Sequence, residues 1–296
     1  MRRESSNRDN QEISWINPIG GLGDQLMISG VLKQVVDNYP SKQYNLIRRT
    51  NYLSILKGHP AIAGVGFPPK DSKTIGTDYW SIEELGPGDK RPYQVLAREF
   101  GLKKPVEEKM YLPDGIDEDP LLNDFLPWKE RNILIAPASD SPRKVAHPSI
   151  WHRLVDFLLA DDFFVVQAGR TKDIHIRNAY SLLGLTTPRQ LIGLLSKFDL
   201  IVTSDSFIMH AAHLTGTRAV VIWGPTNHEI YGYPEHIHIQ MAKNCDLNPY
   251  EDCIGPTRNE GGKLYGTPCP LRERHCVDQI KPEVIYDAIK KALMNF

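Results

Sequence analysis

Apolar positions in the second half of the chain alternate between two spacings, one typical of strands and one typical of helices. Apolar runs of strand length, rich in β-branched and aromatic residues, occupy residues 133–136, 163–166, 200–202 and 219–223. Between them, apolar residues over 151–159, 188–198 and 207–215 recur with the spacing of one helix face. Strands buried on both faces that alternate with helices predict a parallel, doubly wound α/β sheet.

The first half repeats this pattern more weakly. Residues 14–17 predict a strand, residues 20–24 a glycine-rich turn, residues 25–39 a helix and residues 44–47 a second strand. We therefore predict two α/β domains that face a cleft. The predicted divisions are a flexible lead at 1–12, a first domain at 13–128, a second domain at 129–280 with a cysteine-rich insert at 245–276, and a C-terminal amphipathic helix at 281–296.

Composition excludes several classes of protein. The 296 residues carry 35 Lys and Arg against 36 Asp and Glu, a formal charge of −1, so nucleic acid is not the expected partner. No apolar run approaches the ~18 residues of a membrane span, and the first ten residues lack the apolar core of a signal peptide. We expect a cytoplasmic protein that needs no membrane segment and that is able to form oligomers.

Polar residues follow each predicted strand of the second half. Ligands of open parallel sheets bind beyond the carboxyl ends of the strands, where these residues converge. Hydroxyl groups, helix N-terminal N–H groups and basic side chains there suit an anion. The alternative is that such loops are polar in any protein and that Asp205 or Ser206 only caps the next helix. The loops in question are residues 137–144, 167–171, 203–206 and 224–228.

A glycine-rich turn with an acidic residue opens the first predicted helix. Gly20-Gly21-Leu22-Gly23-Asp24 lacks the Gly-Lys-Ser/Thr of a Walker A loop, and Leu26 stands where a dinucleotide fingerprint needs its third glycine. The helix start stabilises the carboxylate of Asp24 as an anion. Asp24 is therefore either a first-turn capping acid or a functional carboxylate.

Two blocks of sequence resemble glycosyltransferase family 9, the ADP-heptose:lipopolysaccharide heptosyltransferases. Gly23-Asp24-Gln25-Leu26 is similar to the family's N-terminal Gly-Asp motif. The stretch 199–206, Met209-His210-Ala211-Ala212 and Gly224-Pro225-Thr226 are similar to its donor-binding block. The start Gly20-Gly21-Leu22-Gly23 also resembles family 11 fucosyltransferases, but the donor-binding block makes family 9 the better match.

The resemblance implies a GT-B fold with two Rossmann-like domains and an inverting, metal-independent transfer from a nucleotide-diphosphate sugar, ADP-heptose, to a hydroxyl of a glycan or protein. It makes Asp24 the catalytic base, the domain at 13–128 the acceptor side and the domain at 129–280 the part that binds the nucleotide sugar. It also implies that the C-terminal helix at 281–296 packs back on the first domain. Two departures stand out: Phe207 replaces the family's glycine, and Arg143-Lys144 with His147 replaces its Lys-x-Trp-Pro element. The residues expected to bind the donor are Gly23, Arg143, Lys144, Asp205, Ser206, His210 and Thr226.

All four cysteines lie late in the chain, at Cys245, Cys253, Cys269 and Cys276. Four thiolates can close a tetrahedral zinc or iron site, which would order a segment rich in Gly, Pro and Asn. Some heptosyltransferases that modify bacterial surface proteins are similar in carrying an iron-binding cysteine finger. Buried free thiols and two disulfides remain the alternatives.

Two other functions remain open on the same fold. A hydrolysing sugar-nucleotide epimerase would consume its substrate with water alone. A non-catalytic homologue would bind a sugar nucleotide without turning it over, and Phe207 makes this conceivable.

Overall fold

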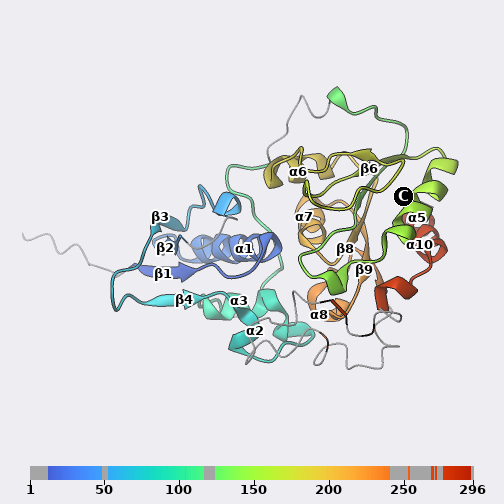
Figure 1. The fold of residues 1–296 in the computed structure, drawn as a ribbon. Coiled ribbons are helices and arrows are strands. Elements are labelled where there is room, and N and C mark those ends of the chain that lie inside the picture. Colours follow the sequence, from blue (N-terminus) through green and yellow to red (C-terminus); the bar gives the residue numbers. More distant parts are fainter. Residues whose placement is uncertain are drawn as a thin grey trace, which may run out of the picture.

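The computed structural model describes residues 13–48, 53–103, 105–116, 124–240, 253, 268–269, 271 and 276–294. The predicted lead at 1–12 and Cys245 lie outside these residues. Two parallel sheets with helices packed around them make up the described chain, and they lie side by side in Figure 1.

The first unit is a parallel sheet with its helices. Its strands are ordered β3-β2-β1-β4. The predicted strands at 14–17 and 44–47 are confirmed, and the predicted helix begins three residues earlier than expected, so Gly23 and Asp24 lie in its first turn. The elements are β1 (Ser14–Asn17), α1 (Leu22–Asn38), β2 (Tyr44–Ile47), η1 (Leu53–Ile55), β3 (Ile62–Gly66), β4 (Thr74–Gly76), α2 (Tyr79–Ile82), η2 (Gly88–Lys90) and α3 (Pro92–Glu99).

The second unit is a larger parallel sheet whose strands are ordered β10-β9-β8-β5-β6-β7. The predicted strands and helices of this half are all found, with small shifts at their ends. The elements are β5 (Asn132–Ala136), η3 (Pro142–Lys144), α5 (Pro148–Ala160), β6 (Phe164–Gln167), β7 (Tyr180–Ser181), α6 (Pro188–Leu195), β8 (Leu200–Ser204), α7 (Phe207–Thr215), β9 (Ala219–Trp223), α8 (His228–Tyr231), β10 (Ile237–Gln240), η6 (Cys276–Gln279) and α10 (Pro282–Met294).

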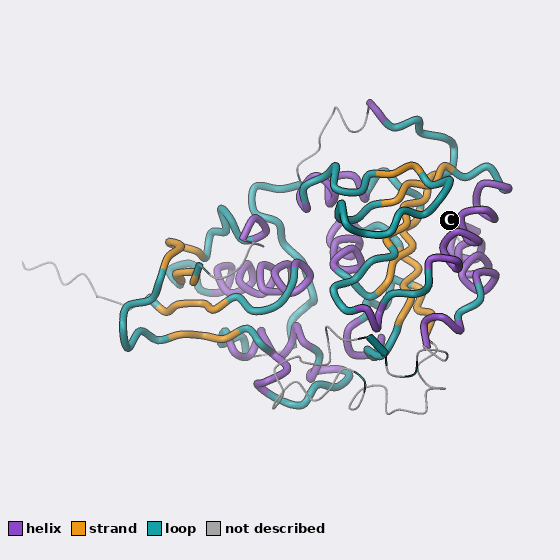
Figure 2. The backbone as a smooth tube through the Cα atoms, viewed as in Figure 1, coloured by secondary structure: helices purple, strands orange, loops and turns teal. Residues whose placement is uncertain are grey.

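Helices cover both faces of the second sheet, which is why its strands read as continuous apolar runs. Alternate residues of β5 face opposite sides: Leu134 joins the buried cluster of α6 and α7, whereas Ile133 and Ile135 join that of α5 and α10. Figure 2 shows the strands between these two layers of helix. The α6 and α7 side faces the first unit, and its cluster continues into α1.

The C-terminal helix packs differently from the prediction. We expected residues 281–296 to cross back onto the first domain. Instead Ile285, Ile289 and Ala292 of α10 are fully buried in the cluster that α5 forms on the far side of the second sheet. The prediction is wrong because an amphipathic stripe shows that a helix has an apolar face, but not which apolar surface that face covers.

Two arginine side chains, one from each unit, donate to main-chain carbonyls of the other unit. Arg91 of the first unit donates to the carbonyl oxygens of Glu229 at 3.0 Å and Gly232 at 2.6 Å. Arg189, at the start of α6, donates to the carbonyl oxygens of Pro113 at 2.6 Å and Gly115 at 3.0 Å. The two units are thus tied by charge-assisted hydrogen bonds as well as by the apolar contact of α1 with α7.

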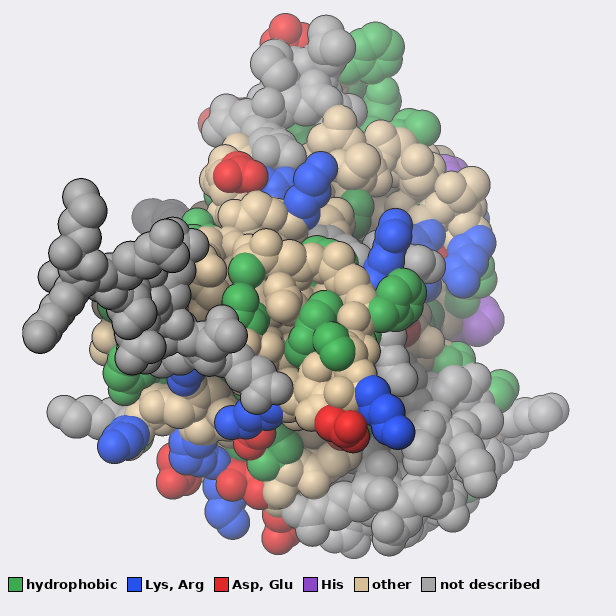
Figure 3. All heavy atoms as spheres, turned by 90° about the vertical axis from the view of Figure 1, so that its left-hand side faces the viewer, with side chains coloured by type: hydrophobic (Ala, Val, Ile, Leu, Met, Phe, Trp, Pro, Cys, Tyr) green, Lys and Arg blue, Asp and Glu red, His purple; other side chains and the backbone are tan. Residues whose placement is uncertain are grey.

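The surface of the first unit carries mixed charge. Figure 3 shows basic and acidic side chains next to one another on the described part of one face, with hydrophobic side chains between them. No helix among the described residues is both long and apolar enough to cross a bilayer.

Candidate active site

Asp24 is held at the start of α1 by two hydrogen bonds. Its Oδ2 accepts the Gly21 N–H at 2.7 Å, and its Oδ1 accepts the Tyr79 hydroxyl at 2.8 Å. A Cβ on Gly20, whose φ of 104° is left-handed, would lie 2.6 Å from the Asp24 Cβ, so the turn requires glycine there. Burial raises the pKa of Asp24, although Tyr79, Gly21 and the Lys144 charge oppose the shift. Asp24 therefore caps the helix and is at the same time a carboxylate with a strengthened hold on a proton.

Asp205 lies directly after β8 and forms a buried ion pair. Its Oδ2 lies 2.8 Å from the Lys144 Nζ, and Thr226 donates its hydroxyl to the same oxygen. Burial alone would raise the pKa of Asp205, but Lys144 and Thr226 together lower it. The Lys144 charge also lowers the pKa of Asp24 and of His210. The ammonium group of Lys144 thus acts on every ionisable group of the cluster.

His210, on α7, lies against the first turn of α1. A Cβ on Gly23 would overlap the His210 ring and lie 2.9 Å from its Nε2. The other ring nitrogen, Nδ1, lies 2.6 Å from the Tyr233 hydroxyl. Burial lowers the pKa of His210 to about 4, so the ring is neutral at physiological pH.

The remaining predicted donor-binding residues divide into two groups. Ser206 caps α7, with its Oγ 3.3 Å from the Ile208 N–H, and Thr226 bonds Asp205. Arg143 is not part of the cluster: its guanidinium donates to the carbonyl oxygen of Cys253 and lies 3.4 Å from the Cys253 Sγ. The structure therefore brings together Gly23, Asp24, Lys144, Asp205, Ser206, His210 and Thr226, and places Arg143 elsewhere.

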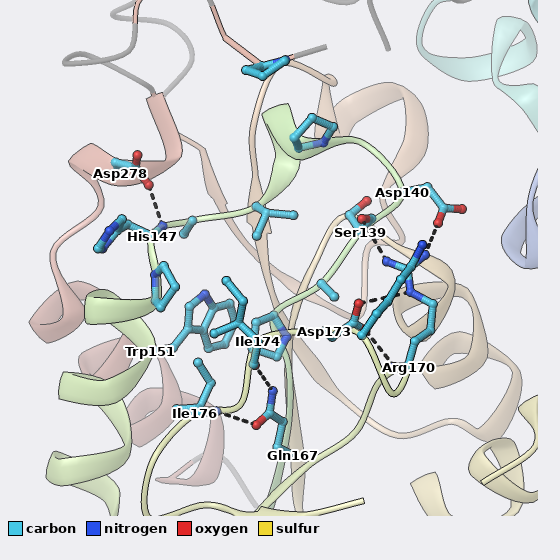
Figure 4. Close-up of a pocket in the computed structure, with 18 of the residues that line it drawn as sticks. Ser139, Asp140, His147, Trp151, Gln167, Arg170, Asp173, Ile174, Ile176 and Asp278 are labelled. Atoms are coloured by element: carbon cyan, nitrogen blue, oxygen red, sulfur yellow. Dashed lines mark hydrogen bonds and ion pairs between the residues drawn. The ribbon is translucent and has the colours of Figure 1, made fainter. Parts of the chain in front are cut away.

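A cavity of about 530 Å³ adjoins this cluster at the carboxyl ends of β5 and β6. Trp151, Ile174 and Ile176 form an apolar wall, which Gln167 holds through bonds of 2.8 and 2.7 Å to the backbone at 174 and 176 (Figure 4). The opposite side is charged, with Arg170 paired to Asp140 and Asp173 at 2.6 and 3.1 Å. Ser139 lines the cavity and donates to the Asp205 carbonyl at 2.9 Å, so the cavity lies next to the cluster.

Sequence reasoning missed Tyr79, Tyr233 and Asp173. Tyr79 forms a hydrogen bond with Asp24 across 55 positions of the chain, and Tyr233 forms one with His210 across 23 positions. Asp173 lies just after the loop 167–171, which the sequence did predict to be polar. No local pattern marks such partners. The only available signal for Asp173 was its place just beyond a predicted strand end.

The family model for glycosyltransferase family 9 (heptosyltransferase) matches residues 90–252, more than half of the chain, including the cluster from Lys144 to Thr226. The chain belongs to glycosyltransferase family 9. It is thus a heptosyltransferase-like glycosyltransferase. No curated protein sequence matches it.

Three solved structures of glycosyltransferases share the fold over 96% of this chain. Escherichia coli ADP-heptose LPS heptosyltransferase II has a TM-score of 0.65 at 15% identity, with 96% of this chain and 99% of that chain covered. Dodecameric iron-containing TibC, in complex with ADP-D-β-D-heptose, has a TM-score of 0.69 at 15% identity, with 96% and 76% covered. A family 9 enzyme of Veillonella parvula has a TM-score of 0.68 at 13% identity, with 96% and 98% covered. Two facing units of the GT-B type are therefore confirmed as the fold.

Gly23→Ala tests the close approach of α1 and α7 in this family 9 enzyme. The new methyl group would overlap His210, and overpacking of this kind costs about 1–3 kcal/mol. Alanine has a better helix propensity than glycine, which offsets up to about 1 kcal/mol of that cost in the free energy of unfolding. The substitution should therefore affect kcat more than the stability of the fold. We expect kcat to fall by roughly 10–100-fold, because displaced reacting groups lose their alignment.

The matched control is Gly86→Ala, measured in the same kinetic and thermal unfolding assays. Its methyl group would meet the Lys90 side chain at 3.5 Å, an ordinary contact. Equal kinetics for Gly23→Ala and wild type would show that the approach of His210 to α1 has no role in turnover.

Proposed function

We propose that this enzyme transfers heptose from ADP-heptose to a hydroxyl group of a glycan or protein, with inversion at the anomeric carbon and without a metal ion in the chemical step. The observation that carries the proposal is the cluster of Asp24, Lys144, Asp205 and His210 at the junction of the two units, in which Lys144 and Asp205 are buried and Asp24 and His210 are half-buried. Similar structures described as heptosyltransferases, one of them in complex with ADP-D-β-D-heptose, support the choice of sugar and nucleotide.

Asp24 is the general base of the proposed reaction. The acceptor oxygen attacks the anomeric carbon from the side opposite the diphosphate, and its proton passes to Asp24 as the bond to the diphosphate oxygen breaks. Burial that raises the pKa of Asp24 makes its carboxylate a better proton acceptor. A single displacement of this kind inverts the configuration of the sugar.

The second unit holds the donor and stabilises the leaving diphosphate. In this proposal, Lys144, the N–H groups at the start of α7 and the His210 ring stabilise the negative charge that develops on the diphosphate. The adjoining cavity takes the nucleoside: its apolar wall of Trp151, Ile174 and Ile176 suits a purine, and Asp173 can accept hydrogen bonds from ribose hydroxyls.

Thermal unfolding with ADP tests the donor site. A ligand that binds only the folded protein stabilises it by about 2.7 kcal/mol at a hundredfold excess over its dissociation constant. We expect this stabilisation for the wild type, and a clearly smaller one at the same ADP concentration for Asp205→Ala and His210→Ala. Mass spectrometry of acceptors incubated with sugar nucleotides then identifies the product. If no nucleoside diphosphate or sugar nucleotide shifts the unfolding transition, the transferase proposal fails, whereas turnover with water alone would indicate a hydrolase.

We also propose a structural zinc or iron ion in the cysteine-rich segment. Cys253 and Cys276 are buried, and Cys269 lines the same cavity as Pro142 and Asp278. Cys253 contacts the Arg143 side chain of η3. Val277, next to Cys276, lies 3.3 Å from the position that a Cβ on Gly224 would take, and the Arg143 carbonyl lies beside the same position. Cys253 and Val277 therefore both lie next to η3. Within the described residues alone, no three His, Cys, Asp or Glu side chains form a metal-binding group, and Cys245 lies outside them. The iron content of the similar TibC supports the proposal.

Elemental analysis tests the metal. We expect about one zinc or iron per chain, a lower content in each Cys→Ser variant, and protease sensitivity of the segment 245–276 once the metal is removed. Nucleotide binding should persist, because four thiolates leave no open position for a substrate. Metal-free protein with four titratable thiols and unchanged protease resistance would instead indicate free cysteines.

A further inference from the structure

His210 has different surroundings at its two ring nitrogens. Nδ1 lies 2.6 Å from the Tyr233 hydroxyl. Nε2 faces the first turn of α1, 2.9 Å from the position that a Gly23 Cβ would take. Within the ranges that the structure describes, no group forms a hydrogen bond with Nε2, so this nitrogen keeps its hydrogen-bonding capacity for a ligand.

The proton between Tyr233 and His210 belongs to the tyrosine. Tyr233 is only 2% exposed, and burial raises its pKa well above 10, so the hydroxyl keeps its proton. Among the residues whose structure is described, this hydroxyl has one acceptor, the His210 Nδ1. If Nδ1 carried the ring proton instead, the buried O–H would lose its acceptor, at a cost of about 1–3 kcal/mol. Since His210 is neutral, its single N–H is then at Nε2.

We propose that Tyr233 is a positioning residue that fixes His210 as the Nε2–H tautomer, so that an uncharged ring presents a hydrogen-bond donor to the diphosphate of the sugar nucleotide. The identity of the ligand in this inference rests on the proposed function. The tautomer rests on the hydrogen bond between Tyr233 and His210 and on the groups around it.

Tyr233 is held in place by groups from both units. The His213 ring stacks on it at 3.9 Å with an angle of 3° between the ring planes. His213 in turn bonds the Glu235 carboxylate and, through Nε2, the Glu108 carbonyl of the first unit at 2.6 Å. The preceding carbonyl, of Gly232, accepts from Arg91. The tyrosine therefore has little freedom to move its hydroxyl away from Nδ1.

A neutral donor suits this position because Lys144 already supplies the local positive charge. A second cation would repel Lys144, whereas an oriented N–H adds a hydrogen bond to the leaving oxygen without that repulsion. Loss of one such donor lowers kcat by roughly 10²–10³-fold in other enzymes. Loss of tautomer control alone should cost less, since part of the population keeps the proton at Nε2.

Two-bond ¹H–¹⁵N spectra of the histidine rings of the full-length protein test the inference, with the His210 signals assigned by His210→Gln. In the wild type, free and saturated with ADP, we expect a protonated Nε2 and a bare Nδ1. In Tyr233→Phe we expect a mixture of tautomers or protonation at Nδ1, and a kcat lowered by roughly tenfold with a smaller change in the KM of the donor. The control is Tyr44→Phe, which removes a buried hydroxyl that has no hydrogen-bond partner in the described part of the chain and should change neither result.

A wild-type spectrum with the His210 proton at Nδ1 overturns the inference whether or not Tyr233→Phe folds. So does a Tyr233→Phe protein that keeps the Nε2–H signature and the wild-type kcat. Because the spectrum does not depend on sugar transfer, the tautomer assignment stands or falls separately from the proposed activity.

Discussion

Asp24→Asn should lower kcat by roughly 10²–10⁴-fold, the usual contribution of a general base, while the dissociation constant of the donor changes little. Asparagine can keep both local hydrogen bonds, because its amide oxygen can accept from the Gly21 N–H and its NH₂ group can donate to the Tyr79 oxygen. The variant therefore removes the proton acceptor without disturbing the turn. Steady-state kinetics and ADP titration calorimetry measure the two effects.

Stability and pH give a second readout for the same variant. Burial raises the pKa of Asp24 in the folded protein. Ionisation of Asp24 therefore lowers the free energy of unfolding as the pH rises above the ordinary pKa of an aspartate. At neutral pH the Asn variant should thus unfold at the same or a higher temperature than the wild type. The wild-type kcat should fall on acidification as the base takes up its proton. Near-normal turnover of Asp24→Asn would show that Asp24 is only a helix cap.

Lys144→Met should have the largest effect on stability. It leaves the Asp205 carboxylate, 6% exposed, without its cation, and a broken buried pair typically costs about 3–5 kcal/mol. Lys144 and Thr226 hold the pKa of Asp205 below its usual range against the effect of burial, so their stabilisation is present at neutral pH and is lost as pH falls through that lowered pKa. The loss in Lys144→Met should therefore shrink on acidification. Urea unfolding near neutral pH and below the ordinary pKa of an aspartate measures this.

The control for this prediction is the double variant Lys144→Met, Asp205→Asn. With no unpaired charge left, it should recover a large part of the lost stability, whereas nucleotide binding should remain weak. If the single and double variants unfold alike, the two side chains do not stabilise each other. If Lys144→Met binds ADP normally, Lys144 does not meet the diphosphate.

Local pattern was enough to predict most elements of the second unit. Strands such as β8 and β9 are buried on both faces, and the helices between them carry apolar stripes, so the alternation is present in the sequence itself. The first unit was harder to predict, because every residue of β3 and β4 is half-buried or exposed, which leaves little apolar signal. The order of the strands and the packing of α10 depend on contacts between distant residues, which periodicity does not contain.

The residues of the candidate site also differ in how well the sequence predicted them. Asp24, Asp205 and His210 lie in compact motifs at the ends of strands, where topology alone brings them near the cleft. Their partners Tyr79 and Tyr233 come from segments without a recognisable motif. Arg143 and Lys144 are adjacent in η3, yet one reaches Cys253 and the other Asp205. The sequence could not distinguish the two residues, because both are basic. The backbone conformation of η3 decides which side chain reaches Asp205.

The two arginines that join the units have a consequence for sequence drift. Arg91 and Arg189 bond main-chain carbonyls at Glu229, Gly232, Pro113 and Gly115, so most replacements of the side chains at those four positions leave the acceptor atoms in place. One partner of each contact is thus nearly insensitive to mutation. The two contacts therefore persist through many substitutions on the acceptor side, and each depends mainly on keeping its arginine.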